Sequence, residues 1–329
     1  MERGAAHRAA PARVVPLWAV GAIFWTAVAA VIIARAAGVA ESETLATFGV
    51  IFTSIVVEAL PFILLGAAAS AAIAVWVPAR AFARVSRLPV PLQVPAAAAA
   101  GFAMPVCECG SVPVARRLIL RGLSPSAGIA FMLAAPIVNP IVLASTWVAY
   151  GAAGKALEMT AARAGLGLVV AVLAGFLIGR SRDSLVRDRE ERVDQHAHAG
   201  GFVEHLVDDF VFMGRFLVLG AAVAALLQTV VPQEALSAVA DRPVLGALAL
   251  MALAVALSLC SEADAFVAVS FTAFPLGSQL AFLVLGPVVD AKLAVLYGAT
   301  FRRRFVLQVL AVAVPVALAG ALLFDEVFG

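Results

Sequence analysis

The stretch LATFGVIFTSIVVEALPFILLGAAASAAIAVWV (residues 45–77) decides the fold class. Its only charged residue is Glu58, and it is longer than the roughly 20 residues that a helix needs to cross a bilayer. Small and aliphatic residues fill it without the alternation that is typical of a barrel strand. Because backbone groups in lipid must be satisfied within the segment, the stretch predicts a membrane helix.

The rest of the chain resembles this stretch. Apolar residues make up 63% of the 329 residues and charged residues 13%, about half the charged fraction of a soluble domain. The mean hydropathy is +1.03. We therefore predict an all-α polytopic membrane protein rather than a soluble domain. The other apolar runs are Leu17–Ala37, Leu92–Val114, Ser126–Tyr150, Ala164–Ile178, Phe210–Val231, Val244–Leu259, Leu280–Tyr297 and Val306–Phe324.

One long hydrophilic loop divides the chain. We expect residues 1–44 to hold the N-terminal tail and a retained first transmembrane helix, since its apolar run is too long for a signal peptide. Residues 45–179 form a first half, residues 180–205 a charged cytoplasmic loop, and residues 206–329 a second half.

The two halves repeat. The tetrapeptide LGAA at residues 65–68 recurs at residues 219–222, and further along the chain three rarer residues recur at one constant offset of 151 positions. Two halves with helix-breaking residues at equivalent positions indicate the binding site of a transporter. The recurring pairs are Cys109 with Cys260, Pro136 with Pro287, and Asn139 with Asp290.

The placement of arginine favours an inverted repeat. Cytoplasmic loops of membrane proteins are enriched in Lys and Arg. The basic segments share one side if Leu92–Val114 and Val244–Val267 are re-entrant or broken, which gives seven full crossings. If both cross the membrane, the chain has nine crossings and parallel repeats.

Both cysteine segments combine helix breakers with polar residues. The first is PVCECGSVP (residues 105–113) and the second CSEADAF (residues 260–266). Proline removes a backbone donor, and irregular backbone at membrane depth is tolerated only where it is buried in protein or lines a wet cavity. An interfacial loop is the alternative interpretation.

All three cysteines of the chain lie in these segments. Buried cysteine is often only a small apolar residue, but Cys107, Cys109 and Cys260 can converge on one soft metal or metalloid ion, because thiolates select soft acceptors. Disulfide exchange is the weaker alternative, since no C-x-x-C is present.

Carboxylates beside these thiols suggest proton coupling. Glu262 and Asp264 adjoin an apolar run, where charge is costly unless it faces a pathway or a partner. The alternative is that both only cap a helix N-terminus. Glu58, Asn139 and Asp290 are further candidates at membrane depth, and Lys292 is a neutralising partner for Asp290.

A second polar group lies in the charged loop and just after it. His196, His198 and His205 can collect a metal, although a solvated linker with incidental histidines is the favoured interpretation. No P-loop, G-x-S-x-G or H-E-x-x-H motif is present, so we expect neither an enzyme, nor a cofactor, nor a nucleic-acid partner.

Several segments resemble the predicted-permease family that includes the organoarsenical efflux permease ArsP and the YraQ-type proteins. The resemblance runs from about residue 47 to residue 324. It implies a plasma-membrane permease, with thiols that bind trivalent organoarsenicals in the arsenical members and Cu/Zn efflux in others. Its most specific parts are residues 107–114, 134–140, 260–266, 274–277 and 286–290.

The leading interpretation is a secondary permease that exports a thiophilic substrate, either a metalloid species or a soft metal ion. An ion channel built from the same broken helices and an intramembrane thiol enzyme are the rival interpretations. The expected partners are the substrate, the bilayer and coupling protons. The sequence does not settle the oligomeric state.

The inverted arrangement makes a labelling prediction. Cysteines introduced at Ser86 and Arg303 should react with an impermeant thiol reagent from the same, cytoplasmic side, because both positions lie in basic segments. Labelling from opposite sides of the membrane would refute the seven-crossing topology.

Overall fold

A computed structural model describes residues 43–77, 88–104, 106–180, 201–230, 242–302 and 304–328. Contacts between residues divide the chain into a unit that ends at Gly49 and a unit that spans Val50–Gly329. The predicted first span, Leu17–Ala37, and most of the charged loop lie outside the described residues, so the structure adds nothing to those predictions. The helices belong to the second unit, apart from the start of the first of them.

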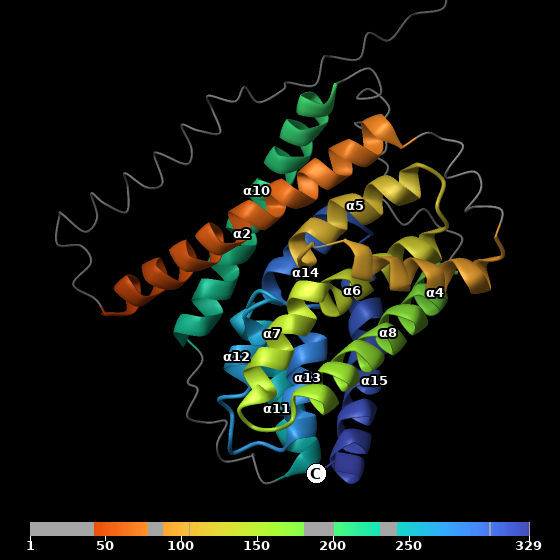
Figure 1. The fold of residues 1–329 in the computed structure, drawn as a ribbon. Coiled ribbons are helices and arrows are strands. Elements are labelled where there is room, and N and C mark those ends of the chain that lie inside the picture. The colour runs from red at the N-terminus through yellow and green to blue at the C-terminus, as the bar shows by residue number, and fades with distance from the viewer. Residues whose placement is uncertain are drawn as a thin grey trace, which may run out of the picture. The chain divides into compact units, whose positions relative to one another are not determined.

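The described residues form helices and no β-strand (Figure 1). Five helical stretches are long and apolar enough to cross a membrane: Leu45–Trp76, Pro125–Gly151, Ala156–Gly179, Phe202–Thr229 and Phe305–Phe328. Large apolar side chains cover exposed faces of these stretches. For example, Leu307 and Leu323 on the last one are 67% and 62% exposed. Such surfaces suit contact with lipid, and the predicted class of all-α polytopic membrane protein is confirmed.

The described helices fall before and after the charged loop. Those of the first half are α2 (Glu43–Trp76), α4 (Val90–Ala100), η2 (Gly101–Ala103), α5 (Glu108–Leu120), α6 (Pro125–Val138), α7 (Pro140–Gly151) and α8 (Ala156–Gly179). Those of the second are α10 (Phe202–Val230), α11 (Pro243–Leu257), α12 (Asp264–Ala268), α13 (Leu276–Leu285), α14 (Ala291–Thr300) and α15 (Phe305–Phe328).

Proline positions several helix starts. Pro125, Pro140 and Pro243 each occupy the first helical position of α6, α7 and α11. The missing N–H of proline has no intrahelical partner at that position anyway, so the residue begins a helix there without loss. Ser124 completes the start of α6, because its hydroxyl accepts a hydrogen bond from the Ala127 amide at 3.3 Å.

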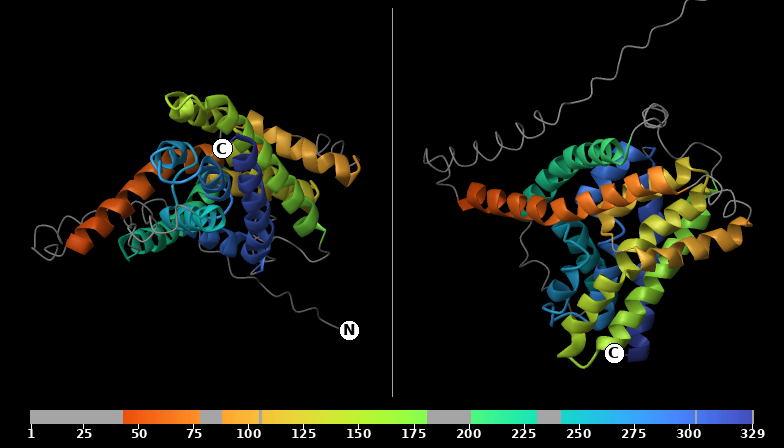
Figure 2. Two further views of the ribbon diagram at one scale, coloured as in Figure 1. Left: turned by 90° about the horizontal axis from the view of Figure 1, so that it is seen from below. Right: turned by 45° about the horizontal axis from the view of Figure 1, so that its top comes forward.

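One short helix on each side of the charged loop packs between two others. α6 packs against α4 and α8, and α13 packs against α11 and α15 (Figures 1 and 2). Across the halves, α5 contacts α14 and α12 contacts α7. If α5 corresponds to α12 and α7 to α14, the two cross-contacts are the same contact made twice.

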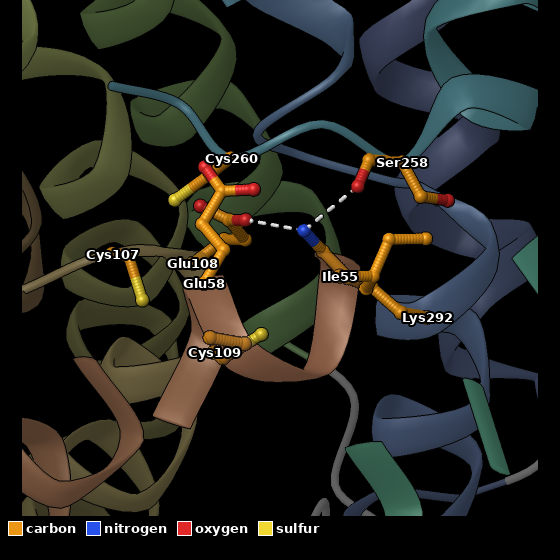
Figure 3. Close-up of a pocket in the computed structure, with 9 residues that line it drawn as sticks. Ile55, Glu58, Cys107, Glu108, Cys109, Ser258, Cys260 and Lys292 are labelled. Carbon is orange, nitrogen blue, oxygen red and sulfur yellow. Dashed lines mark hydrogen bonds and ion pairs between the residues drawn. The ribbon is translucent and has the colours of Figure 1, made fainter. Parts of the chain in front are cut away.

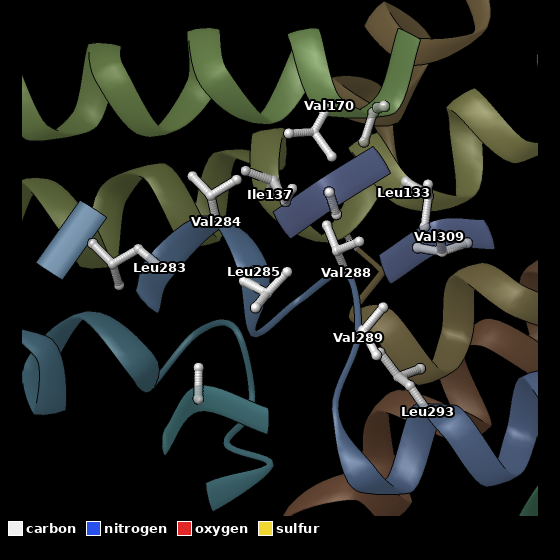
Figure 4. Packing of buried hydrophobic residues seen from close by; sticks show 14 of the residues in the cluster. Leu133, Ile137, Val170, Leu283, Val284, Leu285, Val288, Val289, Leu293 and Val309 are labelled. Atoms are coloured by element: carbon white, nitrogen blue, oxygen red, sulfur yellow. The ribbon is translucent and has the colours of Figure 1, made fainter. Parts of the chain in front are cut away.

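The apolar core joins the two halves. Leu133 and Ile137 of α6 lie near Val170 of α8, while residues 283–289 come from α13 and the turn after it (Figure 4). Val309 of α15 is also fully buried in this cluster. Burial of such aliphatic side chains fixes the frame that surrounds the two cysteine segments.

Two glycines allow the long helices α2 and α10 to pack closely against their neighbours. Gly66 and Gly220, the glycines of the recurring LGAA segments, both lie where another backbone approaches closely. A Cβ on Gly66 would overlap Gly110 of α5, and a Cβ on Gly220 would lie 2.7 Å from Cα of Lys292 in α14. Each recurring glycine therefore lets a long helix pack against a residue next to the site described below.

We predict that Gly66→Ala and Gly220→Ala each destabilise the purified protein by about 1–3 kcal/mol, the usual cost of overpacking. Gly214→Ala on α10 is the matched control, because among the described residues no atom outside the local backbone of α10 lies within 4 Å of its added Cβ. The measurement is thermal unfolding in detergent. Equal midpoints for all three variants would contradict the close packing.

Candidate functional site

The first cysteine segment interrupts a helical path. After α4 and the short η2 turn, the backbone is extended at Met104 and at Cys107, and α5 begins at Glu108. Glu108 thus stands in the first turn of a helix, where the dipole favours a negative charge. The Val106 carbonyl, left free by the break, accepts a hydrogen bond from Asn139 Nδ2 at 3.4 Å.

The second cysteine segment interrupts a second helical path, which begins with α11. Helix α11 ends at Leu257, and Ser258 adopts a left-handed conformation with φ of 48°, which residues other than glycine adopt only at a cost. The Ser258 hydroxyl accepts a hydrogen bond from the Ala291 amide at 3.1 Å. This bond ties the break to the start of α14, and Cys260 follows two residues later.

A small pocket lies between these two breaks, α2 and α14 (Figure 3). The thiols of Cys107, Cys109 and Cys260 all contribute to it, and the Cys107 thiol is close enough to interact with the other two. All three cysteines are free and buried. The full lining is Ile55, Glu58, Ala59, Cys107, Glu108, Cys109, Ser258, Cys260 and Lys292.

An ion pair crosses the pocket. Glu108 Oε1 lies 2.8 Å from Lys292 Nζ, and the two side chains are 1% and 4% exposed. The Lys292 ammonium also donates to the carbonyls of Ser258 at 3.0 Å and Leu259 at 3.3 Å. Figure 3 shows the ammonium between Glu108 and Ser258. This lysine therefore holds the two interrupted segments together.

The carboxylates of Glu108 and Glu262 lie close to the thiol of Cys260. Glu108 Oε2 accepts a hydrogen bond from Ser261 Oγ at 2.9 Å. The Cys260 thiol donates to Glu262 Oε2 at 2.6 Å. The ligand atoms of Glu108, Cys260 and Glu262 all lie within 4.8 Å of one another, close enough for a modest rearrangement to place them around one ion.

Asn139 and Asp290 have the same local role. Asn139 Oδ1 accepts from the Val142 amide at 2.9 Å and begins α7, while Asp290 Oδ1 accepts from the Leu293 amide at 2.6 Å and begins α14. Both are N-cap residues in extended conformation. Each also supports a cysteine segment, Asn139 through Val106 and Asp290 through Lys292, whose Nζ is 3.5 Å from its Oδ2.

Asp264 faces away from this pocket toward Arg163 of α8. The guanidinium donates to both carboxylate oxygens at 2.8 and 2.7 Å, and also to Thr146 Oγ1 at 2.8 Å. Arg163 is fully buried. Within the part of the chain that the structure describes, the pocket lining does not include Asp264, so this bidentate pair orients α12 against α8.

A second buried charge cluster lies on α5 and α10. Asp209 accepts from Ser70 Oγ at 2.6 Å and from Arg117 at 3.1 Å, and Arg116 is 3.8 Å away. His205, on the same helix as Asp209, is also buried. His196 and His198 lie outside the described residues, so the predicted histidine metal site stays a prediction.

Six of the eight candidate residues therefore gather at the pocket or support it directly, and Glu262 reaches it through Cys260. Sequence reasoning missed Glu108 as a site residue, gave Lys292 too small a role, and did not single out Ser258. It also missed Arg163, because the apolar run was taken to begin at Ala164 whereas α8 begins at Ala156. A lone arginine within a membrane helix demands a buried partner, which was the available signal.

The class of protein is thus a polytopic α-helical membrane protein with a thiol- and carboxylate-lined pocket between interrupted helices. The chain belongs to the ArsP_1 family, described as a predicted permease, whose model matches residues 44–326. This membership confirms the family resemblance and supports a permease rather than an enzyme.

Two relatives are similar over most of their length. The UPF0718 protein YcgR of Bacillus subtilis (strain 168) is 41% identical over 286 residues, which cover 83% of this chain and 95% of the relative. A putative two-component membrane permease complex subunit of Streptococcus mutans serotype c (strain ATCC 700610 / UA159) is 35% identical over 268 residues, covering 78% and 88%. No solved structure matches the chain.

The pair of Arg163 and Asp264 makes a stability prediction. Arg163→Met should cost about 3–5 kcal/mol, because it leaves a carboxylate buried without its partner. The double variant Arg163→Met/Asp264→Leu should recover most of that loss, since apolar residues can replace a buried pair. Thermal unfolding in detergent measures both.

The control for this prediction is Arg215→Met, which removes an exposed arginine from α10 that lies over the rings of Phe212 and Phe216 and should cost only about 1 kcal/mol. A double variant as unstable as Arg163→Met alone would contradict the assignment, because the loss would then not come from the unpaired carboxylate.

Proposed function

We propose that this permease is a secondary carrier that exports a thiophilic substrate, a trivalent organoarsenical or a related metalloid species, through the pocket described above. The observation that carries the proposal is that all three cysteines of the chain line one buried pocket, although they come from segments about 150 residues apart. Chance placement of three apolar cysteines gives no reason for that convergence.

Thiols give such a pocket its chemistry. Sulfur ligands prefer soft acceptors, and each arsenic–sulfur bond that forms releases an oxygen ligand of arsenic as water, which takes up the thiol proton. A trivalent mono-organoarsenical keeps its arsenic–carbon bond and exchanges two oxygen ligands, so two thiols bind it, whereas an inorganic trivalent species can take all three thiols. A pocket inside the protein also keeps this exchange away from competing thiols in solution.

The arrangement of the helices favours a carrier over a channel. The recurring caps at Asn139 and Asp290, and the two reciprocal contacts of α5 with α14 and α12 with α7, support the repeat that alternating access uses. The substrate site is buried between interrupted helices, as in carriers whose halves move around a fixed site. An ion channel remains the rival mechanism, and saturation of transport separates the two.

Protons are the proposed coupling ions. Glu58 lines the pocket and Glu262 accepts the hydrogen bond of the Cys260 thiol, so both carboxylates lie at the site and can themselves carry the coupling proton, while the thiol protons leave in the water that forms. Transport that stops when the proton gradient is collapsed supports this part of the proposal. We place the carrier in the plasma membrane, with the charged loop at residues 180–205 in the cytoplasm.

A soft metal ion is the second candidate substrate. The specific observation in its favour is that Glu108, Cys260 and Glu262 form a mixed group of oxygen and sulfur ligands. The Streptococcus relative is described as a subunit of a two-component complex, so co-purification from native membranes is the experiment that reveals whether this chain also has a second subunit.

The transport prediction uses a sensitive host that expresses the chain or single serine variants at its three cysteines. Growth in arsenite, methylarsenite, antimonite, copper and zinc identifies the substrate. Export of the identified substrate from loaded cells should fall at least tenfold in Cys107→Ser, Cys109→Ser and Cys260→Ser, because a hydroxyl is a poor ligand for soft ions.

The control is Ser145→Ala on α7, which changes a hydroxyl that bonds only to the Val142 carbonyl of its own helix among the described residues. It should export as the wild type does. Equal membrane levels of all variants are checked by immunoblot. If the three serine variants export the substrate at the wild-type rate, the thiol pocket is not the transport site.

A further inference from the structure

Lys292 lies between two buried carboxylates. Its ammonium is 2.8 Å from Glu108 Oε1 and 3.5 Å from Asp290 Oδ2. The carbonyls of Ser258 and Leu259 hold the same ammonium at 3.0 and 3.3 Å. A small movement of the side chain therefore transfers Lys292 from one carboxylate to the other while its two carbonyl partners stay within reach.

One carboxylate oxygen of Asp290 can receive the Lys292 ammonium after that transfer. Its Oδ1 begins α14 through the Leu293 amide at 2.6 Å, but its Oδ2 is buried and, within the described part of the chain, has only the 3.5 Å ion pair with the Lys292 ammonium. A buried carboxylate oxygen without a hydrogen bond is costly. The ammonium of Lys292 is the nearby group that can satisfy it.

The first half shows that the cap itself needs no charge. At the position equivalent to Asp290, Asn139 forms the same bond to the amide three residues later, with a neutral side chain. The carboxylate of Asp290 is therefore more than the cap requires, and its additional charge faces Lys292. This difference between the halves points to a role for Asp290 in balancing the charge of the pocket.

Glu108 is the group that such a movement would release. Its ligand atom lies within 4.8 Å of those of Cys260 and Glu262. Zinc binds sulfur at about 2.3 Å and carboxylate oxygen at about 2.0–2.2 Å, so ligands around one tetrahedral ion lie roughly 3.6 Å apart. One thiol and two carboxylates suit a divalent cation of borderline softness.

We propose that Glu108, Cys260 and Glu262 bind a divalent cation of the Zn²⁺ or Cd²⁺ type, and that Lys292 takes the place of this cation on Glu108 until the ion arrives. On binding, Lys292 moves to Asp290, and the Cys260 proton leaves to water as the metal–sulfur bond forms. This inference rests on the second candidate substrate of the proposed function, a soft metal ion, because it assigns the class of that ion and its ligands in the same pocket.

The exchange keeps Glu108 neutralised in both states, and in the empty pocket the Lys292 ammonium also stays 3.5 Å from Asp290 Oδ2. With the pocket empty, Lys292 neutralises Glu108; with the cation bound, the ion neutralises Glu108 and Lys292 neutralises Asp290. An unpaired charge at this depth would be strongly unfavourable. The tethered lysine thus allows an empty carrier to exist without a cation, which a carrier needs in order to return after release.

The test is a cadmium titration of the purified full chain in detergent, followed by calorimetry and by the ultraviolet band of the cadmium–thiolate bond. Glu108→Gln should weaken binding at least a hundredfold, and Asp290→Asn at least tenfold, because Lys292 then has no second carboxylate and stays on Glu108. Asp290→Asn should fold normally, since an amide already caps α7 at Asn139.

The matched control is Asp325→Asn, which makes the same chemical change at a carboxylate that accepts a hydrogen bond from the Gly277 amide at the start of α13. It should bind cadmium as the wild type does. Wild-type affinity in Glu108→Gln would overturn the cation site, and wild-type affinity in Asp290→Asn would overturn the exchange of Lys292.

These failures differ from a failure of the thiol pocket. Failure of the cation site appears as wild-type cadmium affinity in Glu108→Gln. Failure of the thiol pocket appears instead as wild-type export in the cysteine variants. The two outcomes are read from different substitutions and from different measurements.

Discussion

The ion pair between Glu108 and Lys292 is the interaction on which the pocket between the two interrupted helices depends. It joins α5 of the first half to α14 of the second at 2.8 Å, and both side chains are almost fully buried. Buried ion pairs contribute little net stability, but removal of one partner is severely destabilising. The surrounding hydrogen bonds from Ser261 and to the Ser258 carbonyl explain how the protein tolerates the pair.

Interrupted helices make this centre possible. A continuous helix satisfies its own backbone groups and offers no free carbonyl at membrane depth, whereas the breaks before α5 and after α11 release the carbonyls of Val106, Ser258 and Leu259. Asn139 donates a hydrogen bond to the first of these carbonyls, and Lys292 donates to the other two. The same breaks bring thiols and carboxylates together at the pocket, so structural irregularity and chemical function have one origin.

Much of this could be predicted from the sequence. Hydropathy is a local property of the sequence, so the apolar runs predicted the class of protein directly. The family model matches residues 44–326, which include the segments on which the family resemblance was based. The three cysteines and Asn139 with Asp290 were identifiable because rare residues recurred at one offset. The repeat itself and its orientation stay predictions, although the caps and the reciprocal helix contacts support them.

The remainder depends on tertiary structure that sequence patterns do not encode. Glu108 was quoted within its motif, but only the fold brings Lys292, nearly two hundred residues away, to its carboxylate. Asp264 looked equivalent to Glu262 from its neighbours, yet the position of α8 places Arg163 beside it and separates the roles of the two acids. The helix break at Ser258 could not be predicted from the residue type, because serine seldom adopts a left-handed conformation.

X-ray absorption spectroscopy of the purified chain loaded with one equivalent of cadmium tests the central claim most directly, because it reports the atoms that surround the ion. The account predicts a mixed shell with sulfur from the cysteine segments and oxygen from the carboxylates. A shell of oxygen or nitrogen alone would contradict a substrate site built on these thiols.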